Sequence, residues 1–202
     1  MIEELARVAG RAVSRETIER LHAYSACLRE ENSRQNLVSS STLDHLWTRH
    51  ILDSAQLLRF EPFPEAAWCD IGSGAGLPGI VVACLADGPV TLVEPRRLRA
   101  EFLHRVADSL KLDVVVVQAK AERAVGSFDI ITARAVANLA QLLKISAHLS
   151  TRKTVWALPK GRTAREELVD AQHSWQGAFH VEQSLTDIDA GIVIATDVRP
   201  KR

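Results

Sequence analysis

The amino-acid sequence predicts an α/β fold, in which a helical extension precedes a mostly parallel seven-stranded sheet with helices on both faces. From residue 66 onward, short apolar runs alternate with amphipathic segments, which is typical of strand–helix–strand units around a parallel sheet. Residues 3–31 and 43–58 instead carry apolar side chains at helical spacing. The chain has 202 residues, of which 47% are hydrophobic, so it can bury a full core. We therefore expect a helical extension over 1–64 and an α/β domain over 65–202.

The helical extension is predicted to contain two amphipathic stretches. Ser14 is a plausible N-cap within the first stretch because a side-chain oxygen at that position can accept from an unpaired backbone N–H. A polar segment, NSRQNLVSSST, follows at 32–42 and leads into the second stretch, LDHLWTRHILDSAQLL at 43–58. Pro62 and Pro64 then end the helical pattern.

The α/β part is predicted to hold five parallel strands and a late antiparallel pair. The parallel strands are expected near 67–71, 90–94, 113–118, 128–133 and 153–158, and the pair near 180–184 and 192–198. Helices are expected near 77–86, 96–110, 137–149 and 162–174. Because ligands of open α/β sheets bind at the carboxyl ends of the strands, functional residues are expected there.

Composition limits the possible partners. The 25 Lys and Arg residues balance 25 Asp and Glu residues, so nucleic-acid binding would have to rely on local patches. Cys27, Cys69 and Cys84 lack the spacing of a zinc site or a disulfide framework, and we expect no metal. No run of about 18 apolar residues and no leader-like segment is present, which predicts a cytoplasmic protein without a membrane partner.

A glycine-rich segment, DIGSGAGLPG at 70–79, lies between a predicted strand and a predicted helix. Glycines let the backbone pass close to a ligand, and the helix N-terminus offers unpaired N–H groups. Gly72, Gly74 and Gly76 form GxGxG, whereas Leu77 occupies the last glycine position of the nicotinamide-type GxGxxG. No GK[ST] follows, which excludes a P-loop. A tight structural turn remains the alternative, but the order DxGxGxG favours an S-adenosylmethionine site and a class I methyltransferase.

Three further strand ends carry candidate ligand contacts. Glu94 ends the run VTLV roughly 20 residues after the glycines, where an acidic residue accepts hydrogen bonds from ribose hydroxyls in nucleotide-binding folds. The segment QAKAE at 118–122 suits an adenine edge, with a surface turn as the alternative. The run FDIITARA places a lone cation, Arg134, at the end of a fourth strand. A dehydrogenase would share this architecture, but the glycine spacing of this chain does not match the one that dehydrogenases use.

These residues resemble those of the bacterial small-subunit ribosomal RNA guanine-N7 methyltransferases, the RsmG or glucose-inhibited division protein B family. The resemblance covers nearly the whole chain. Its most specific motifs are RHILDSAQLL at 49–58, DIGSGAGLPGI at 70–80, TLVEPRRLRAEFL at 91–103, ITARAVANL at 131–139 and LPKG at 158–161.

The resemblance implies a class I, Rossmann-like fold and methyl transfer from S-adenosylmethionine to N7 of one guanine in 16S ribosomal RNA. It implies action on the assembled small subunit, and we expect a monomer. The implied cofactor contacts, with the glycine loop included, are Gly72, Gly74, Leu77, Glu94, Ala121, Glu122 and Arg134.

The chemistry implied by the resemblance needs no general acid or base. Guanine N7 carries a free lone pair at neutral pH, so catalysis reduces to alignment of the reacting atoms, and we expect no catalytic proton-transfer residue. Candidate RNA contacts are Arg49, His50, Arg96, Arg97 and Lys160, and solvated helix faces are the alternative for the cations. Asp53 could stabilise a cationic product, although an i,i+4 pair with Arg49 is the simpler interpretation.

Two other functions stay open from the sequence. An enzyme of the same fold could act on a small molecule or a protein, which the neutral net charge would suit. A noncatalytic binding module could also have kept the fold.

Overall fold

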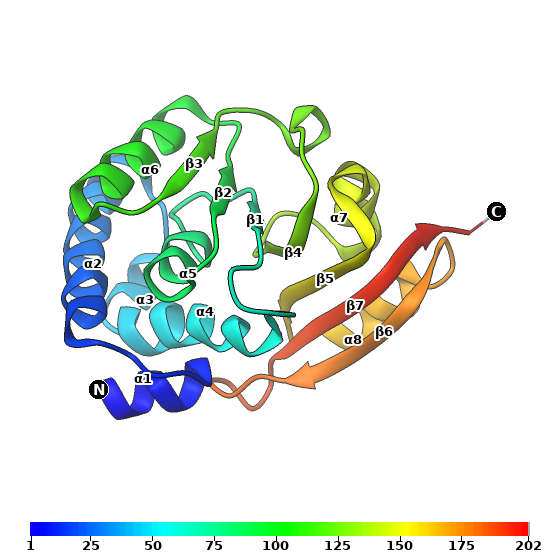
Figure 1. The fold of residues 1–202 in the computed structure, drawn as a ribbon, viewed down its shortest axis with the longest axis horizontal. Coiled ribbons are helices and arrows are strands. Elements are labelled where there is room, and N and C mark those ends of the chain that lie inside the picture. The colour runs from blue at the N-terminus through cyan, green and yellow to red at the C-terminus, as the bar shows by residue number, and fades with distance from the viewer. Residues whose placement is uncertain (202) are drawn as a thin grey trace.

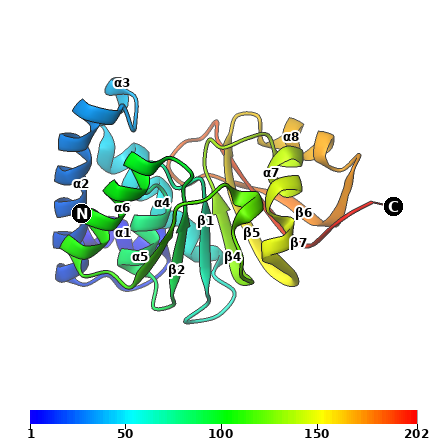
Figure 2. The same ribbon diagram turned by 90° about the horizontal axis from the view of Figure 1, so that it is seen from above.

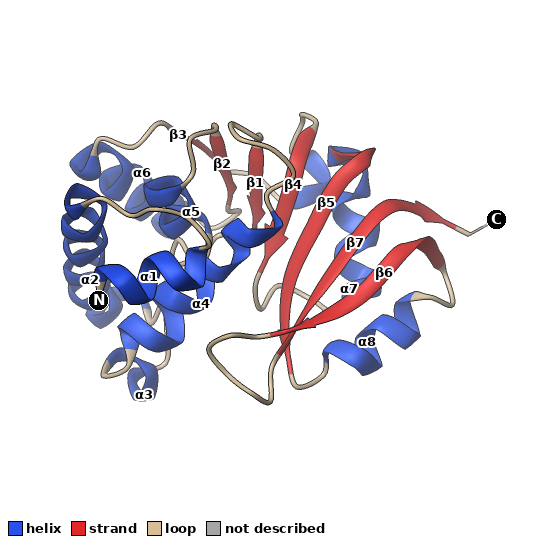
Figure 3. Ribbon diagram, turned by 60° about the horizontal axis from the view of Figure 1, so that its bottom comes forward, coloured by secondary structure: helices blue, strands red, loops and turns tan. Residues whose placement is uncertain are grey.

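The computed structural model describes residues 1–201 and contains one seven-stranded sheet (Figure 1). The strands are β1 (Trp68–Ile71), β2 (Val90–Val93), β3 (Val114–Val117), β4 (Phe128–Ala133), β5 (Ser150–Gly161), β6 (Trp175–Gln183) and β7 (Gly191–Pro200). Their order is β3-β2-β1-β4-β5-β7-β6, with β7 antiparallel to both of its neighbours and the other pairs parallel. The predicted α/β class, with five parallel strands and a late antiparallel pair, is confirmed. Strands β5, β7 and β6 are longer than predicted and extend side by side beyond the short central strands (Figure 3).

Helices cover both faces of the sheet (Figure 2). They are α5 (Gly79–Leu85), α6 (Arg97–Leu110), α7 (Leu139–Ser146) and α8 (Ala164–Ala171). Two clusters of buried apolar side chains lie on opposite faces, because successive side chains of a strand alternate between them. Trp68 belongs to the cluster beneath α5 and α6, and its neighbour Cys69 belongs to the cluster beneath α7 and α8.

The helical extension begins with α1 (Ile2–Ala9) and α2 (Arg15–Gln35). Ser14 caps α2 as predicted, since its side chain accepts from the backbone N–H of Thr17 at 3.0 Å. Helix α2 packs along α5 and α6, and its apolar side chains share one core with theirs. No helix among residues 1–201 combines the length and apolarity needed to cross a membrane.

The second helical stretch is not the regular helix that its periodicity suggests. It is divided into α3 (Ser40–Leu43), a π-helical turn (Trp47–Leu52), α4 (Asp53–Ala55) and a 3-10 turn (Gln56–Phe60). Side chains of this stretch form hydrogen bonds with residues far away in the sequence, including Arg134 and Ser184. Short π-helical turns inside helices are frequent at functional sites, and here the turn brings polar groups to the carboxyl edge of the sheet.

Candidate functional site

The glycine loop connects β1 to α5 at the carboxyl edge of the sheet. Gly72, Gly74 and Gly76 have φ angles of +67°, +54° and +90°, a region that only glycine enters without strain. A Cβ atom on Gly72 would lie 2.6 Å from Cγ2 of Val136, so the loop after β4 approaches the glycine backbone closely. Leu77 is buried at the end of the loop. The loop is therefore a tightly packed backbone cradle of the kind predicted.

Glu94 fastens this loop to the end of β2. Glu94 is only 3% exposed, and its carboxylate accepts from the backbone N–H of Gly74 and of Arg96, each at 2.9 Å. Each carboxylate oxygen can accept two hydrogen bonds, so both retain capacity for a ligand hydroxyl. The Glu94 carboxylate can therefore accept hydrogen bonds from ribose hydroxyls, and it lies next to the loop.

Asp70 lies beneath the loop and has a structural role. Its carboxylate accepts from the backbone N–H of Gly79 at 3.1 Å and from the hydroxyl of Thr132 at 2.9 Å. Burial raises the pKa of Asp70 to about 6, although these hydrogen bonds favour the charged form. A Cβ on Gly79 would collide with Leu92 and the Asp70 carboxylate. Asp70 therefore anchors the first turn of α5.

The segment after β3 forms the third part of this edge. Ala121 and Glu122 lie in a short 3-10 turn, Ala121–Arg123, in which Ala121 is buried and Glu122 is exposed. The end of β3 adjoins Glu94, whose backbone N–H donates to the carbonyl of Val117 at 3.0 Å. All the residues expected to contact the cofactor thus lie along one edge of the sheet.

Arg134 follows β4 and turns towards the helical extension. Its guanidinium lies 3.0 Å from Nδ1 of His50 and 3.6 Å from Oδ2 of Asp53. The expected Asp53–Arg49 pair does not form, because the π-helical turn directs Asp53 to Arg134 across the cleft wall instead. His50 is buried and is therefore not an exposed RNA contact in this conformation.

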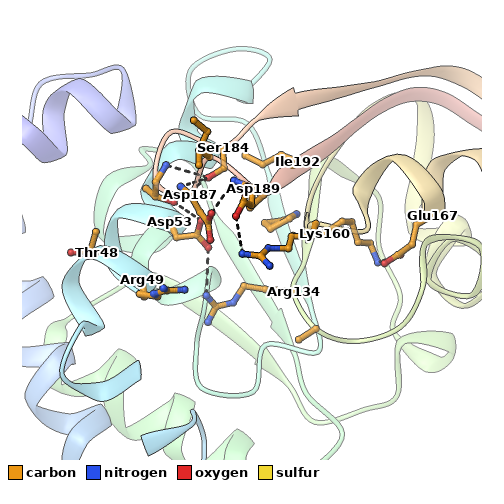
Figure 4. Close-up of a pocket in the computed structure, with 18 of the residues that line it drawn as sticks. Thr48, Arg49, Asp53, Arg134, Lys160, Glu167, Ser184, Asp187, Asp189 and Ile192 are labelled. Atoms are coloured by element: carbon orange, nitrogen blue, oxygen red, sulfur yellow. Dashed lines mark hydrogen bonds and ion pairs between the residues drawn. The ribbon is translucent and has the colours of Figure 1, made fainter. Parts of the chain in front are cut away.

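A cleft of about 880 Å³ opens beside Arg134 (Figure 4). Its walls are the segment around Asp53, the carboxyl end of β5 and the connection between β6 and β7. Charged side chains of both signs line it, namely Arg49, Asp53, Arg134, Lys160, Arg162, Glu167, Asp187 and Asp189. The glycine loop and Glu94 do not line this cleft, so it is adjacent to the predicted cofactor edge and distinct from it.

The predicted RNA-contacting cations differ in their exposure to solvent. Arg49 is exposed at the cleft, and Arg96 and Arg97 are exposed at the start of α6, outside it. Lys160 differs, because its side chain is only 7% exposed and its ammonium group binds Glu167 at 3.0 Å and the carbonyl of Ala137 at 2.6 Å. Lys160 therefore links the two sides of the cleft wall, and its contact with RNA stays a prediction.

Sequence reasoning missed a polar network behind the cleft. Gln56 donates to Oδ1 of Asp53 at 2.8 Å and accepts from the backbone N–H of Leu185 at 2.8 Å. The hydroxyl of Thr186 also donates to Oδ1 of Asp53 at 2.8 Å. A weak signal was present, because His50, Asp53 and Gln56 recur every third residue and so share one side of the segment.

The cysteines and the possible metal ligands are further candidates for parts of a site. Cys27, Cys69 and Cys84 form no disulfide. Within residues 1–201, no cluster of three or more His, Cys, Asp or Glu side chains is placed to hold a metal ion.

Solved structures share the fold of this chain. A ribosomal protein L11 methylase from Lactobacillus delbrueckii subsp. bulgaricus aligns with a TM-score of 0.57 at 15% identity, over 76% of this chain and 79% of that one. An M. jannaschii TYW2 solved in complex with AdoMet aligns with a TM-score of 0.54 at 13% identity, over 70% and 72%. At such low identity these likenesses establish the fold only.

Sequence relatives are much closer. A protein named ribosomal RNA small subunit methyltransferase G from Zymomonas mobilis subsp. mobilis is 44% identical over 199 residues, covering 94% of this chain and 90% of the relative. A protein of the same name from Novosphingobium aromaticivorans is 52% identical over 169 residues, covering 81% and 74%. The family model described as rRNA small subunit methyltransferase G matches residues 17–192. The resemblance drawn from the motifs is confirmed, and with it the S-adenosylmethionine-dependent methyltransferase class: the chain belongs to the rRNA small subunit methyltransferase G family.

Proposed function

We propose that this protein transfers the methyl group of S-adenosylmethionine to N7 of one guanine in 16S ribosomal RNA. The observation that carries the proposal is the adjacency of the glycine loop and the cleft. Val136 packs against Gly72, while Arg134, two residues earlier, lines the cleft. A cofactor held at the loop and a base held in the cleft would therefore meet at the end of β4.

The residues at the sheet edge fit the cofactor. The cradle formed by Gly72 and Gly74 brings backbone close to a ligand, and Glu94 offers acceptors for ribose hydroxyls. Ala121 and Glu122 would border the adenine, and Arg134 would pair with the carboxylate of the methionine part. When bound, S-adenosylmethionine supplies an electrophilic methyl group that the lone pair of guanine N7 can take without prior loss of a proton.

The cleft suits an unstacked nucleotide. Ligand pockets commonly measure about 300–1,000 Å³, and the cleft falls within that range. An enzyme that modifies a base must reach it outside the stack, so a cleft next to the cofactor is required. Exposed Arg49 and Arg162 at the cleft can contact phosphates, which would give local RNA affinity to a chain of zero net charge.

The natural partner in this proposal is the assembled small subunit, on which the protein acts as a monomer in the cytoplasm. The family resemblance supports this partner.

The proposal is tested with labelled S-adenosylmethionine and small subunits from cells that lack this protein. N7-methylguanine is then mapped along the 16S ribosomal RNA, with subunits and naked RNA as separate substrates. We expect label at one guanine, on subunits. Label at no ribosomal RNA position, or at a ring position other than N7, would overturn the proposal.

A matched pair of arginine variants tests the cleft. Arg49→Ala should weaken binding to the subunit and reduce its salt dependence, because a phosphate contact releases counterions. Arg15→Ala removes an arginine that is 88% exposed on α2, away from the cleft, and should leave both unchanged.

A same-fold enzyme acting on a small molecule or a protein is the second candidate. The zero net charge and the acidic side chains in the cleft favour it. It predicts no salt-dependent binding to subunits.

A further inference from the structure

Two residues of the helical extension, His50 and Asp53, contact the guanidinium of Arg134. One nitrogen lies 3.0 Å from Nδ1 of His50, and the same nitrogen lies 3.6 Å from Oδ2 of Asp53. Figure 4 shows the side chains of Asp53 and Arg134 pointing towards each other. The Arg134 side chain is only 21% exposed, so these contacts lie at the inner wall of the cleft.

The contact with His50 determines which nitrogen of the imidazole carries the proton. A guanidinium can only donate, so Nδ1 of His50 must present its lone pair. The imidazole is then neutral, with its proton on Nε2, which lies 2.9 Å from the hydroxyl of Thr42. That hydroxyl donates to the carbonyl of Ser39 at 2.8 Å and so presents a lone pair to Nε2–H. All three hydrogen bonds run in one direction, from Arg134 to the backbone.

The surroundings of His50 favour this neutral form. Burial, together with the charges of Arg134 and Arg49, lowers the pKa of His50 to about 4. Asp53, the nearby carboxylate, has its charge directed at Arg134. At neutral pH the Nδ1 lone pair is therefore permanently available.

Asp53 is itself held in place. Gln56 and Thr186 both donate to its Oδ1, each at 2.8 Å, which leaves Oδ2 for Arg134. A carboxylate that is already ordered loses little entropy when it pairs with a guanidinium.

We propose that His50 is a positioning residue, which orients Arg134 for the cofactor by accepting its hydrogen bond on Nδ1 while Asp53 supplies the opposite charge. The inference rests on the proposed function, in which Arg134 contacts S-adenosylmethionine. In this proposal His50 acts through Arg134 and does not itself contact the cofactor or the base.

The first experiment observes the imidazole directly. Side-chain ¹⁵N NMR of the cofactor-free protein should show His50 as the Nε2–H tautomer at pH 7. The Nδ1–H tautomer, or a charged imidazole, would overturn the proposal. Because this experiment needs no RNA and no methyl transfer, its result is independent of the proposed function.

The second experiment compares two substitutions of His50. His50→Asn places an amide oxygen near the position of Nδ1, whereas His50→Gln reaches towards Thr42 and removes the acceptor that Nδ1 offers to Arg134. We expect His50→Gln to weaken S-adenosylmethionine binding, measured by calorimetry, by about tenfold to a hundredfold, as the loss of a hydrogen bond to a charged group predicts. His50→Asn should keep binding within about threefold of the natural protein, because a hydrogen bond to Arg134 is retained.

Matched controls separate positioning from general stability. His104→Asn removes an exposed histidine on α6 and should leave binding unchanged. Thr42→Val keeps His50 but removes the acceptor for Nε2–H, so it should weaken binding less than His50→Gln does. Thermal unfolding of each variant establishes that it folds. Equal losses of affinity in His50→Asn and His50→Gln, with both folded, would contradict the proposal.

Kinetics give a further readout. With subunits as substrate, His50→Gln should raise the KM for S-adenosylmethionine more than it lowers kcat, since the reacting atoms themselves are untouched. A fall in kcat alone would speak against positioning.

Discussion

The glycine loop and the cleft beside Arg134 share one edge of the sheet but come from different parts of the polypeptide. The loop is one continuous segment, 72–78, whose shape is set mainly by the backbone conformation of its glycines. One carboxylate from a distant position, Glu94, accepts a hydrogen bond from it. The cleft is assembled from side chains around Asp53, Arg134, Lys160 and the β6–β7 connection. A local sequence pattern can therefore specify the loop, whereas only packing can assemble the cleft.

The two regions also balance their charges differently. At the loop, the carboxylates of Asp70 and Glu94 accept from backbone N–H groups, which no substitution elsewhere can remove. At the cleft, charged side chains pair with one another, as Arg134 does with Asp53 and Lys160 with Glu167. Substitutions should therefore act on the loop through backbone strain and on the cleft through unpaired charge.

The largest effect is expected at the loop, from Gly72→Ala. A side chain there must adopt a φ of +67° and displace Val136, which together should lower the free energy of unfolding by about 3–4 kcal/mol. Gly161→Ala is the matched control, because its φ is +61° but its Cβ would meet nothing within 4 Å. Denaturant unfolding should show a cost of only about 1–2 kcal/mol there. Equal costs at both glycines would refute the close approach of Val136.

The stability of the protein should depend on pH through His50, beside the cleft. The folded protein holds the pKa of His50 at about 4 against 6.5 for the unfolded chain, so below pH 6.5 the unfolded chain binds a proton that the folded one refuses. The stability of the natural protein relative to His50→Asn should therefore fall as the pH drops from 7 to 4, by up to about 3 kcal/mol.

Urea unfolding of both proteins across this pH range measures that difference. The pKa of Asp70 is raised in the folded protein, so Asp70 makes the protein more stable as the pH falls. Both proteins contain Asp70, so its contribution cancels in the difference. A difference that stays constant with pH would show that His50 is not held neutral.

Lys160→Met should have a smaller effect. It removes a nearly buried ammonium group and leaves Glu167 with the hydroxyl of Thr163 and the backbone N–H of Leu139. We expect a loss of about 2 kcal/mol, below the usual cost of breaking a buried ion pair because Glu167 keeps these partners. Lys153→Met, on an exposed position of the same strand, should cost almost nothing. A reduced salt dependence of subunit binding in Lys160→Met would show that Lys160 also contacts RNA.

Tyr24→Phe should have the smallest effect and tests how the extension supports the loop. The buried hydroxyl of Tyr24 donates to the carbonyl of Ala75 at 2.8 Å. Its loss should cost about 1 kcal/mol and weaken S-adenosylmethionine binding only slightly. Ser33→Ala, which removes an exposed hydroxyl from the same helix, is the comparison in unfolding and calorimetry. Unchanged stability in Tyr24→Phe would mean that water replaces the hydroxyl.

Where the sequence-based prediction was accurate, the signal was local. The alternating apolar runs placed all seven strands, and Ser14 was placed as a helix cap. The helical run predicted over 43–58 forms over 47–60 as successive π-helical, α-helical and 3-10 turns, in which His50 and Gln56 form hydrogen bonds with residues distant in the sequence. The ion pair of Lys160 with Glu167 was not predicted either, since the position of Glu167 beside it depends on the packing of α8.

By itself, the sequence determined the α/β architecture, the glycine cradle and the acidic residue beyond it. These follow from side-chain periodicity and from φ angles that only glycine adopts freely, which are properties of neighbouring residues. Tertiary structure alone decided the cleft. His50 reaches Arg134 across 84 positions, and Gln56 reaches Ser184 across 128. Such contacts form only once the core has brought the helical extension and the sheet edge together.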